Sequence, residues 1–217
     1  MDVLDQAMAS FLKWQDQYNE AYGLFKEQDI RPLAELCAPG VDGRIPLSPE
    51  LQHFYTRYEI RSGADHKTSL GMKSAAVEIG DAAVLFFPKP EHLFRQQLGY
   101  RWLGTGEPYQ ASPSWPPEHV VIANYNDDPL IVDTASPASP VYGRIDGSEA
   151  FLLADSLADF FSALALLIEA AFAMEGNVTN EETFEIEAAF VEEVRPKLVQ
   201  LLGKDKAENV MKYLSFY

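Results

Sequence analysis

Residues Trp115 to Phe161 are the most informative part of the chain and read WPPEHVVIANYNDDPLIVDTASPASPVYGRIDGSEAFLLADSLADFF. Two apolar, β-branched runs, 120–123 and 130–132, flank the turn-forming sequence Asn124 to Pro129. Turn residues between two strand-like runs predict an antiparallel hairpin. The β-branched side chains are typical of a central position in a sheet.

The residues around this hairpin extend the sheet and add a helix to it. A short strand is expected around residues 140–143, and Ser156 with Asp159 three residues later approximates a capping box that starts a helix. Upstream, the runs 75–79 and 83–87 predict two more strands around a Gly-Asp turn. The sequence therefore predicts an α+β fold with a mixed, mainly antiparallel sheet packed against helices.

Further helices are expected before and between these strands. Apolar residues at spacings of three and four predict an amphipathic helix from Asp2 to about Glu27. Ser48 followed by Pro49 is a favoured helix start, and Gly63 is expected to end this helix or to follow its end. A short helix is predicted for residues 91–98. The segments 38–47, 62–72 and 104–118 lack periodicity and are expected to be loops.

The C-terminal part of the chain is predicted to be helical. The helix that starts at Ser156 should end at Gly176, and Thr179 with Glu182 predicts the start of the next helix, with Phe184 on its apolar stripe. Pro196 is expected to kink or split that helix. A last short helix holds Val210, Met211 and Leu214. We expect residues 1–170 to form one domain with the N-terminal helix, and residues 171–217 to be a helical extension packed on it.

Composition indicates a folded protein of the cytoplasm. The 217 residues are 47% apolar, and the single cysteine, Cys37, allows no intramolecular disulfide, which agrees with a reducing compartment. The N-terminus shows no signal-peptide pattern. The apolar stretch 157–174 contains Asp159 and Glu169, so it is interpreted as a buried helix rather than a membrane span.

The charge is strongly acidic and unevenly distributed. The chain has a formal net charge of −16, and residues 154–200 hold ten acids and two bases, which is half of the excess. Such a chain is repelled by nucleic acid and by anionic membranes. The acidic segment is either a solvated helix face or a surface that attracts a basic partner.

The sequence contains no recognisable catalytic or metal-binding pattern. The four histidines, His53, His66, His92 and His119, lack metal-ligand spacing, and Gly104-Thr105-Gly106 lacks the glycines and lysine of phosphate-binding loops. Asp127, Asp128 and Asp133 lack the ligand order of a calcium loop, and turn chemistry explains Asp127 and Asp128. Cys37 is expected to be a half-buried structural thiol. We therefore expect no cofactor, no metal and no enzymatic activity.

The chain resembles the SUKH superfamily, which includes a fungal cell-wall-assembly regulator and its bacterial relatives. Two blocks carry the resemblance, within residues 44–165: the sequence IPLSPELQHFY at 45–55, and the later block with Trp115, the hairpin turn at 127–129, PVY at 140–142 and ADS at 154–156. Two departures from the family pattern are Ser62-Gly63 and Asp146-Gly147. The resemblance implies an α+β domain with a binding role and no catalytic residues.

Many bacterial members of this superfamily are immunity proteins that neutralise toxins, often nucleases. The resemblance and the acidic surface together indicate a cytoplasmic, non-enzymatic protein-binding domain with a basic protein partner. A regulatory or signalling scaffold, dimeric through the first or last helices, is the alternative. An enzyme that uses the loop 104–117 is a third. The expected partner-binding residues are the aromatic and acidic residues of the long loop and hairpin turn: Tyr109, Trp115, Tyr125, Asp127 and Asp128. For Trp115, a position in the core is the alternative.

Overall fold

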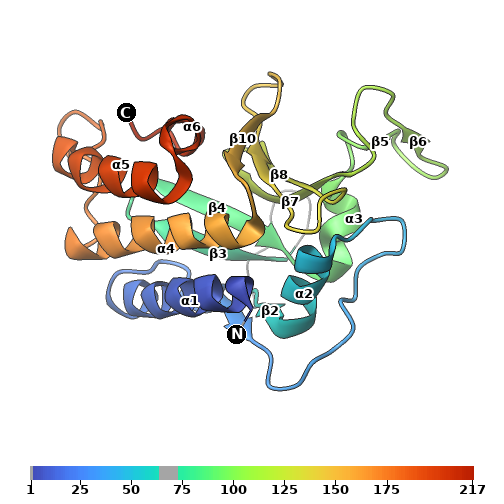
Figure 1. Cartoon of the computed structure of the whole chain (residues 1–217), viewed down its shortest axis with the longest axis horizontal. Coiled ribbons are helices and arrows are strands. Elements are labelled where there is room, and N and C mark those ends of the chain that lie inside the picture. Colours follow the sequence, from blue (N-terminus) through green and yellow to red (C-terminus); the bar gives the residue numbers. More distant parts are fainter. Residues whose placement is uncertain (1, 64–72) are drawn as a thin grey trace.

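The computed structural model describes residues 2–63 and 73–217. In this part of the chain the helices are α1 (Val3–Ala21), α2 (Pro49–Arg57), α3 (Leu93–Gln96), α4 (Leu157–Ala173), α5 (Ala188–Leu202) and α6 (Lys204–Tyr213), and a 3₁₀ turn η1 (Pro90–His92) precedes α3. Helices α1, α4 and α5 lie alongside one another, with α4 in the middle (Figure 1).

The described residues contain one large sheet. Its strands are β3 (Ser74–Ile79), β4 (Ala83–Pro88), β7 (His119–Tyr125), β8 (Asp128–Asp133), β9 (Val141–Gly143) and β10 (Phe151–Ala154). Their order is β10-β9-β8-β7-β4-β3, and each neighbouring pair is antiparallel. Two short pairs lie outside it: β1 (Ile30–Pro32) with β2 (Tyr58–Ile60), and β5 (Trp102–Leu103) with β6 (Gln110–Ala111). The predicted α+β fold, with its N-terminal helix and C-terminal helices, is confirmed.

The predicted central hairpin is present as β7 and β8. Tyr125 pairs with Asp128, and the two residues between them, Asn126 and Asp127, have φ angles of 48° and 67°. Asparagine and aspartate tolerate this left-handed conformation better than other residues with side chains. A two-residue turn of this kind matches the twist of the strands that it joins.

The main core lies between this sheet and the helices, with Phe161 of α4 near its centre. The Phe161 side chain is fully buried, and its ring centroid lies 5.1 Å from that of Phe11, 5.3 Å from that of Phe54 and 6.1 Å from that of Phe87. These rings come from α1, α2 and β4. One residue of α4 thus joins elements from three distant parts of the sequence. The predicted helix start is also confirmed, because the Ser156 hydroxyl accepts a hydrogen bond from the Asp159 amide.

The last two helices share this core. Side chains of α5 and α6 belong to the same buried cluster as those of α1 and α4. Helix α6 packs against the edge strand β10, where the Asn209 side-chain amide donates to the Leu152 carbonyl at 2.8 Å. The predicted extension 171–217 therefore contributes α5 and α6 to one continuous apolar interior.

The opposite face of the sheet carries a smaller apolar cluster. Trp115, Val121 and Ile131 are buried there, and Tyr100 and Tyr142 pack against them half-buried. Trp115 comes from the long loop before β7. This loop therefore covers part of the sheet face that the helices leave open.

Helix α1 ends at Ala21, so the prediction that it continues to about Glu27 is wrong. The carboxylate of Glu78, in β3, accepts hydrogen bonds from the backbone amides of Leu24 and Phe25 at 3.0 and 3.1 Å. These bonds turn the chain away from the helix axis. The apolar periodicity continues past the helix, because residues beyond it also pack on the sheet.

Other predicted boundaries differ where a strand or turn intervenes. Helix α2 ends at Arg57, so Gly63 follows its end and does not form it, because the next three residues pair with β1 as strand β2. The helix predicted for residues 91–98 is the short pair η1 and α3. Of the predicted loop 62–72, residues 64–72 lie outside the described residues. The sequence did not predict strand β10.

The helix predicted to start at Thr179 is not present. Residues 179–187 form a loop closed by a bridge between Thr179 and Ile186, and α5 begins at Ala188. The predicted split at Pro196 is also wrong, because α5 continues through this residue to Leu202. The proline removes one backbone donor but leaves the helix intact, and the buried side chains on either side of it hold α5 against the core.

Candidate protein-binding site

Two of the five predicted interface residues are buried. Trp115 is 6% exposed, and its indole N–H donates to the His119 carbonyl at 2.8 Å. Tyr125 is also 6% exposed, with its ring centroid 6.0 Å from that of Tyr213. The prediction that Tyr125 is an exposed interface residue is therefore wrong. Trp115 takes the core position that was its alternative, because both side chains cover apolar surface next to the sheet.

Tyr109 packs within its own loop. It is half-buried with its ring centroid 5.8 Å from that of Phe94, and the Arg44 guanidinium lies 3.5 Å from the same Phe94 ring. Arg44 also pairs with Glu107 at 3.1 Å. Arg44 and Phe94, which lie outside the loop, thus pack against residues 104–117. This loop is the place of the enzymatic site in the third hypothesis.

Asp127 and Asp128 form the hairpin turn, as expected from their residue types. Asp127 is exposed, whereas the Asp128 carboxylate accepts a hydrogen bond from the Asp146 amide at 2.9 Å. Hydroxyl groups of Tyr100 and Tyr213 donate to the backbone carbonyls of Asp127 and Asp128. The turn is therefore fixed from both faces of the sheet.

A pocket next to this turn combines aromatic and acidic residues. It has a volume of about 480 Å³ and is formed by the β3–β4 turn, the end of β7, the loop 179–186 and the C-terminal residues. We call it the acidic–aromatic pocket. Its lining residues are Asp81, Ala82, Tyr125, Thr179, Phe184, Glu185, Ile186, Ser215 and Tyr217. Tyr125 is thus the one predicted interface residue that the pocket contains.

Two aromatic side chains of the pocket are exposed to an unusual degree. Phe184 is 82% exposed and Tyr217 is 68% exposed. Large exposed aromatic side chains that lie together are typical of protein-interaction sites. The neighbouring residue Phe216 is fully buried against Phe190, with ring centroids 5.2 Å apart, so the backbone that carries Tyr217 is held in place.

The loop that carries Phe184 is held by its own polar contacts. The Asn180 side-chain oxygen accepts hydrogen bonds from the amides of Glu182 and Thr183 at 3.0 Å, and the Phe184 amide donates to the Asn180 carbonyl at 2.8 Å. Phe184 has a φ of 58°. A bulky residue in this left-handed region is strained, at a cost of about 1–2 kcal/mol. The loop therefore holds an aromatic ring in solvent at an energetic cost.

Asp81 connects this loop to the sheet. Its carboxylate accepts hydrogen bonds from the amides of Val178 and Thr179 at 2.9 and 3.0 Å. The preceding residue, Gly80, has a φ of 60°, and a Cβ atom there would lie 2.3 Å from a methyl carbon of Val178. The sequence Gly80-Asp81 therefore fits both the β3–β4 turn and the close approach of the loop.

The pocket is acidic on its walls and at its rim. Asp81 and Glu185 are exposed carboxylates of its lining, which includes neither lysine nor arginine. Glu181 and Glu182 lie next to Phe184 in the loop and are exposed. Partial burial raises the pKa of the Tyr217 hydroxyl, so this side chain stays neutral at physiological pH. The pocket thus presents aromatic surface and negative charge together.

Other reactive side chains have structural explanations. His119 stacks on Tyr142 with ring centroids 5.5 Å apart, and burial lowers the pKa of its imidazole, so it is largely neutral at pH 7. His53 is bonded to Asp5 at 2.9 Å. Cys37 is exposed, so its predicted half-buried position is wrong. Among residues 2–63 and 73–217, no group of three His, Cys, Asp or Glu side chains is placed to hold a metal ion.

Comparisons with known proteins leave the resemblance as a prediction. No family model, curated protein or solved structure matches the chain at a significant level. Within the described residues, no helix has the length and apolar character needed to cross a membrane.

Sequence reasoning missed Phe184, the most exposed aromatic residue of the pocket. It precedes Ala188 and Val191 at helical spacing, and this spacing predicts a place on the apolar stripe of a helix. One local signal points to the loop instead: asparagine at position 180 favours a turn in which its side chain bonds backbone amides two and three residues later.

Proposed function

We propose that this protein is a non-enzymatic binding domain for a basic protein, and that the acidic–aromatic pocket receives a lysine or arginine side chain of that partner. The observation that carries the proposal is the pair of exposed rings, Phe184 and Tyr217, in a pocket that also contains two carboxylates. A cation gains energy both from the face of an aromatic ring and from a nearby carboxylate.

The size and charge of the pocket fit such an occupant. A volume of about 480 Å³ admits a long side chain together with neighbouring atoms of its backbone. The cation would find acids and rings on the walls, and no lysine or arginine of the lining would repel it. A carboxylate of the partner would meet Asp81 and Glu185 instead, so the pocket discriminates against acidic side chains.

The charge of the whole chain favours the same class of partner. A protein of net charge −16 attracts basic proteins over several ångströms and speeds their encounter. The acidic loop lies in the segment 154–200, which carries half of this charge. We expect the affinity for the partner to fall at least about tenfold between roughly 0.05 and 0.5 M NaCl, because salt screens the charges.

A toxin that binds nucleic acid is a partner of this kind, because its active site is basic. We propose immunity to such a toxin as the biological role, supported by the resemblance to the SUKH superfamily and by the acidic pocket. A regulatory or signalling scaffold that binds a basic protein is the alternative. Both roles place the protein in the cytoplasm with the partner that it binds.

Co-expression tests the immunity role. Each large open reading frame that neighbours the gene is expressed alone and together with this chain. We expect a neighbour that stops growth alone and is neutralised by co-expression. If no neighbour is toxic, the scaffold role is favoured, and a pull-down from the native cytosol identifies the partner.

Matched variants test whether the pocket does the binding. Phe184→Ala removes the exposed ring, and Glu185→Lys reverses one charge of the pocket; we expect each to weaken binding at least about tenfold, since truncated anchors typically cost more than about 1.4 kcal/mol. Leu103→Ala and Glu149→Lys are the controls, because both residues are exposed and neither lines the pocket. Equal affinities for all four variants would place the interface elsewhere.

A further inference from the structure

The carboxylates of the acidic–aromatic pocket have oxygen atoms that the rest of the described chain does not use. In Asp81, the atom Oδ1 accepts the hydrogen bonds from the amides of Val178 and Thr179, whereas Oδ2 accepts none from residues 2–63 and 73–217. The exposed Glu185 carboxylate likewise has no hydrogen-bond or ion-pair partner within these residues. Two segments of the pocket therefore offer acceptors to a donor from outside.

The exposed rings of the pocket accompany these acceptors. Phe184 directly precedes Glu185 in the same loop, and Tyr217 comes from the C-terminal residues. The hydrogen bonds to Asn180 and the buried Phe216 hold the backbone at the two ring-bearing residues. A guest in the pocket thus meets aromatic surface and carboxylate oxygens that are already in place, and it gains most if it contacts both at once.

An arginine side chain can contact both at once. Its guanidinium is planar, and its five N–H groups point outward in the plane of the group. One face can therefore lie on an aromatic ring while the edges donate to Oδ2 of Asp81 and to the Glu185 carboxylate. A lysine ammonium is a compact charge that is more strongly hydrated, so it loses more hydration when it contacts a ring.

We propose that the acidic–aromatic pocket selects arginine over lysine in its basic partner. The inference rests on the proposed function, because it names which of two cationic side chains that site prefers. Phe184 and Asp81 are the residues that determine the preference, through the ring face and the free oxygen. Attraction by net charge alone would take lysine equally well, so the preference separates a shaped site from a generally acidic surface.

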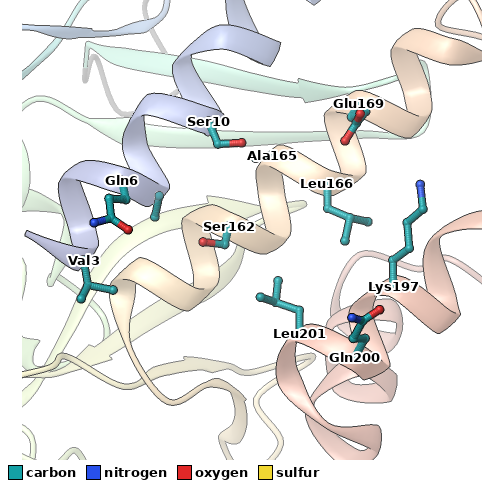
Figure 2. A pocket seen from close by; sticks show the side chains of 11 residues that line it. Val3, Gln6, Ser10, Ser162, Ala165, Leu166, Glu169, Lys197, Gln200 and Leu201 are labelled. Atoms are coloured by element: carbon teal, nitrogen blue, oxygen red, sulfur yellow. The ribbon is translucent and has the colours of Figure 1, made fainter. Parts of the chain in front are cut away.

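A larger pocket elsewhere in the molecule lacks this combination and serves as a comparison. It has a volume of about 650 Å³ and lies between α1, α4 and α5 (Figure 2). None of the 11 described residues that line it is aromatic. Its one acid, Glu169, lies at the same end as Lys197, and Lys197 is already paired with Glu193 of α5. A cation there would meet a lysine and no ring.

NMR titrations of the ¹⁵N-labelled full chain test the preference with three probes: N-acetylarginine methylamide, N-acetyllysine methylamide and N-acetylcitrulline methylamide. Citrulline has the shape of arginine without its charge. We expect the arginine probe to bind at least about threefold more tightly than the lysine probe and about tenfold more tightly than the citrulline probe. The amide signals of Phe184 and Glu185 report binding, and those of Ser162 and Lys197, which line the pocket of Figure 2, should stay unchanged.

Two variants separate the shape of the site from its charge. Phe184→Leu keeps an apolar side chain but removes the ring face. Asp81→Asn keeps an Oδ1 acceptor for the amides of Val178 and Thr179 but places an NH₂ group where Oδ2 was. We expect each variant to bring the affinities for arginine and lysine within about twofold of each other. The control Glu149→Gln, exposed and outside the pocket, should keep the preference.

The outcomes distinguish this inference from the proposed function. If neither cationic probe binds up to about 50 mM, or if citrulline binds as tightly as arginine, the cation site itself is contradicted and the preference with it. Binding of both cations with lysine equal to or tighter than arginine would overturn the preference and leave the cation site in place. A preference that persists in both folded variants, Phe184→Leu and Asp81→Asn, would also overturn it.

Discussion

Two phenylalanines show how differently two regions of this protein are held together. Phe161 is fully buried among rings from α1, α2 and β4, and its position follows from apolar burial alone. Phe184 is 82% exposed, has a φ of 58° and is held by hydrogen bonds around Asn180. Burial of Phe161 lowers the free energy of the folded chain, whereas the exposed and strained position of Phe184 raises it.

This difference indicates which of the two regions serves a binding partner. Strained residues persist when the surrounding structure determines them, and they are frequent at binding sites. Contacts within the protein account for the positions of the side chains in the helical core. The acidic–aromatic pocket has two exposed rings, Phe184 and Tyr217, that burial does not explain.

Removing the central ring of the core should have the largest effect. We expect Phe161→Ala to lower the free energy of unfolding by about 3–5 kcal/mol. The substitution leaves a cavity, and the packed rings around it cannot move far enough to fill it. Urea denaturation followed by circular dichroism measures the change. A loss below about 1 kcal/mol would contradict the central position given to Phe161.

A methyl group at the turn that joins the two regions should have the next largest effect. Gly80→Ala places a Cβ 2.3 Å from a methyl carbon of buried Val178, at a φ of 60°. We expect a cost of about 2–4 kcal/mol, from overpacking together with the left-handed backbone. Thermal melts of Gly80→Ala and Val178→Ala, singly and combined, should show that the two costs are not additive.

A carboxylate beside the core should make stability depend on pH. Burial raises the pKa of Glu50 to about 7, assisted by the charges of Asp2 and Asp159 and opposed by hydrogen bonds from the amides of Leu157 and Ala158. The folded chain holds this proton more tightly than the unfolded chain. Its stabilising contribution is therefore complete below about pH 4.5 and is lost as the pH rises to about 7.

Glu50→Gln removes this dependence and keeps an acceptor for the Leu157 amide. A pKa shift of one unit corresponds to about 1.4 kcal/mol, which we reduce because the side chain is only half-buried. We expect Glu50→Gln to be more stable than the original protein by about 1–2 kcal/mol at pH 8 and equally stable near pH 4. Denaturation curves of both proteins across this range measure the difference. A variant that is less stable at pH 8 would contradict the assignment.

Substitution of the exposed ring should have the smallest effect on stability. Phe184→Gly relieves the left-handed strain, and we expect it to raise the free energy of unfolding by about 0.5–1 kcal/mol, while Phe184→Ala changes it by less than about 0.5 kcal/mol. Both variants should bind the basic partner more weakly. A large loss of stability in Phe184→Ala would show that this ring serves the fold instead.

The elements that could be predicted from the sequence are those that depend on neighbouring residues in the chain. Ser48 and Ser156 cap their helices as predicted, and Asn126 and Asp127 form the turn between β7 and β8. The boundaries that it missed depend on distant contacts: Glu78 ends α1 from β3, and such a bond leaves no trace in the periodicity of the helix.

The candidate site was predicted only in part, for a similar reason. Residue type indicated Trp115 and Tyr125 as interface aromatics, but tertiary packing buries both. The pocket gathers the β3–β4 turn, the loop 179–186 and the C-terminal residues, which are far apart in the sequence. The acidic excess of segment 154–200 was the sequence feature that pointed toward it.

Cation binding by the acidic–aromatic pocket is tested by an NMR titration of the ¹⁵N-labelled protein with N-acetylarginine methylamide, which presents one guanidinium side chain. We predict that the amide signals of Thr179, Phe184 and Glu185 shift and saturate in the millimolar range, and that N-acetylleucine methylamide leaves them unchanged. Phe184→Ala and Glu185→Lys should abolish the response. No shift up to about 50 mM, or equal shifts across all acidic parts of the surface, would contradict a cation-binding pocket.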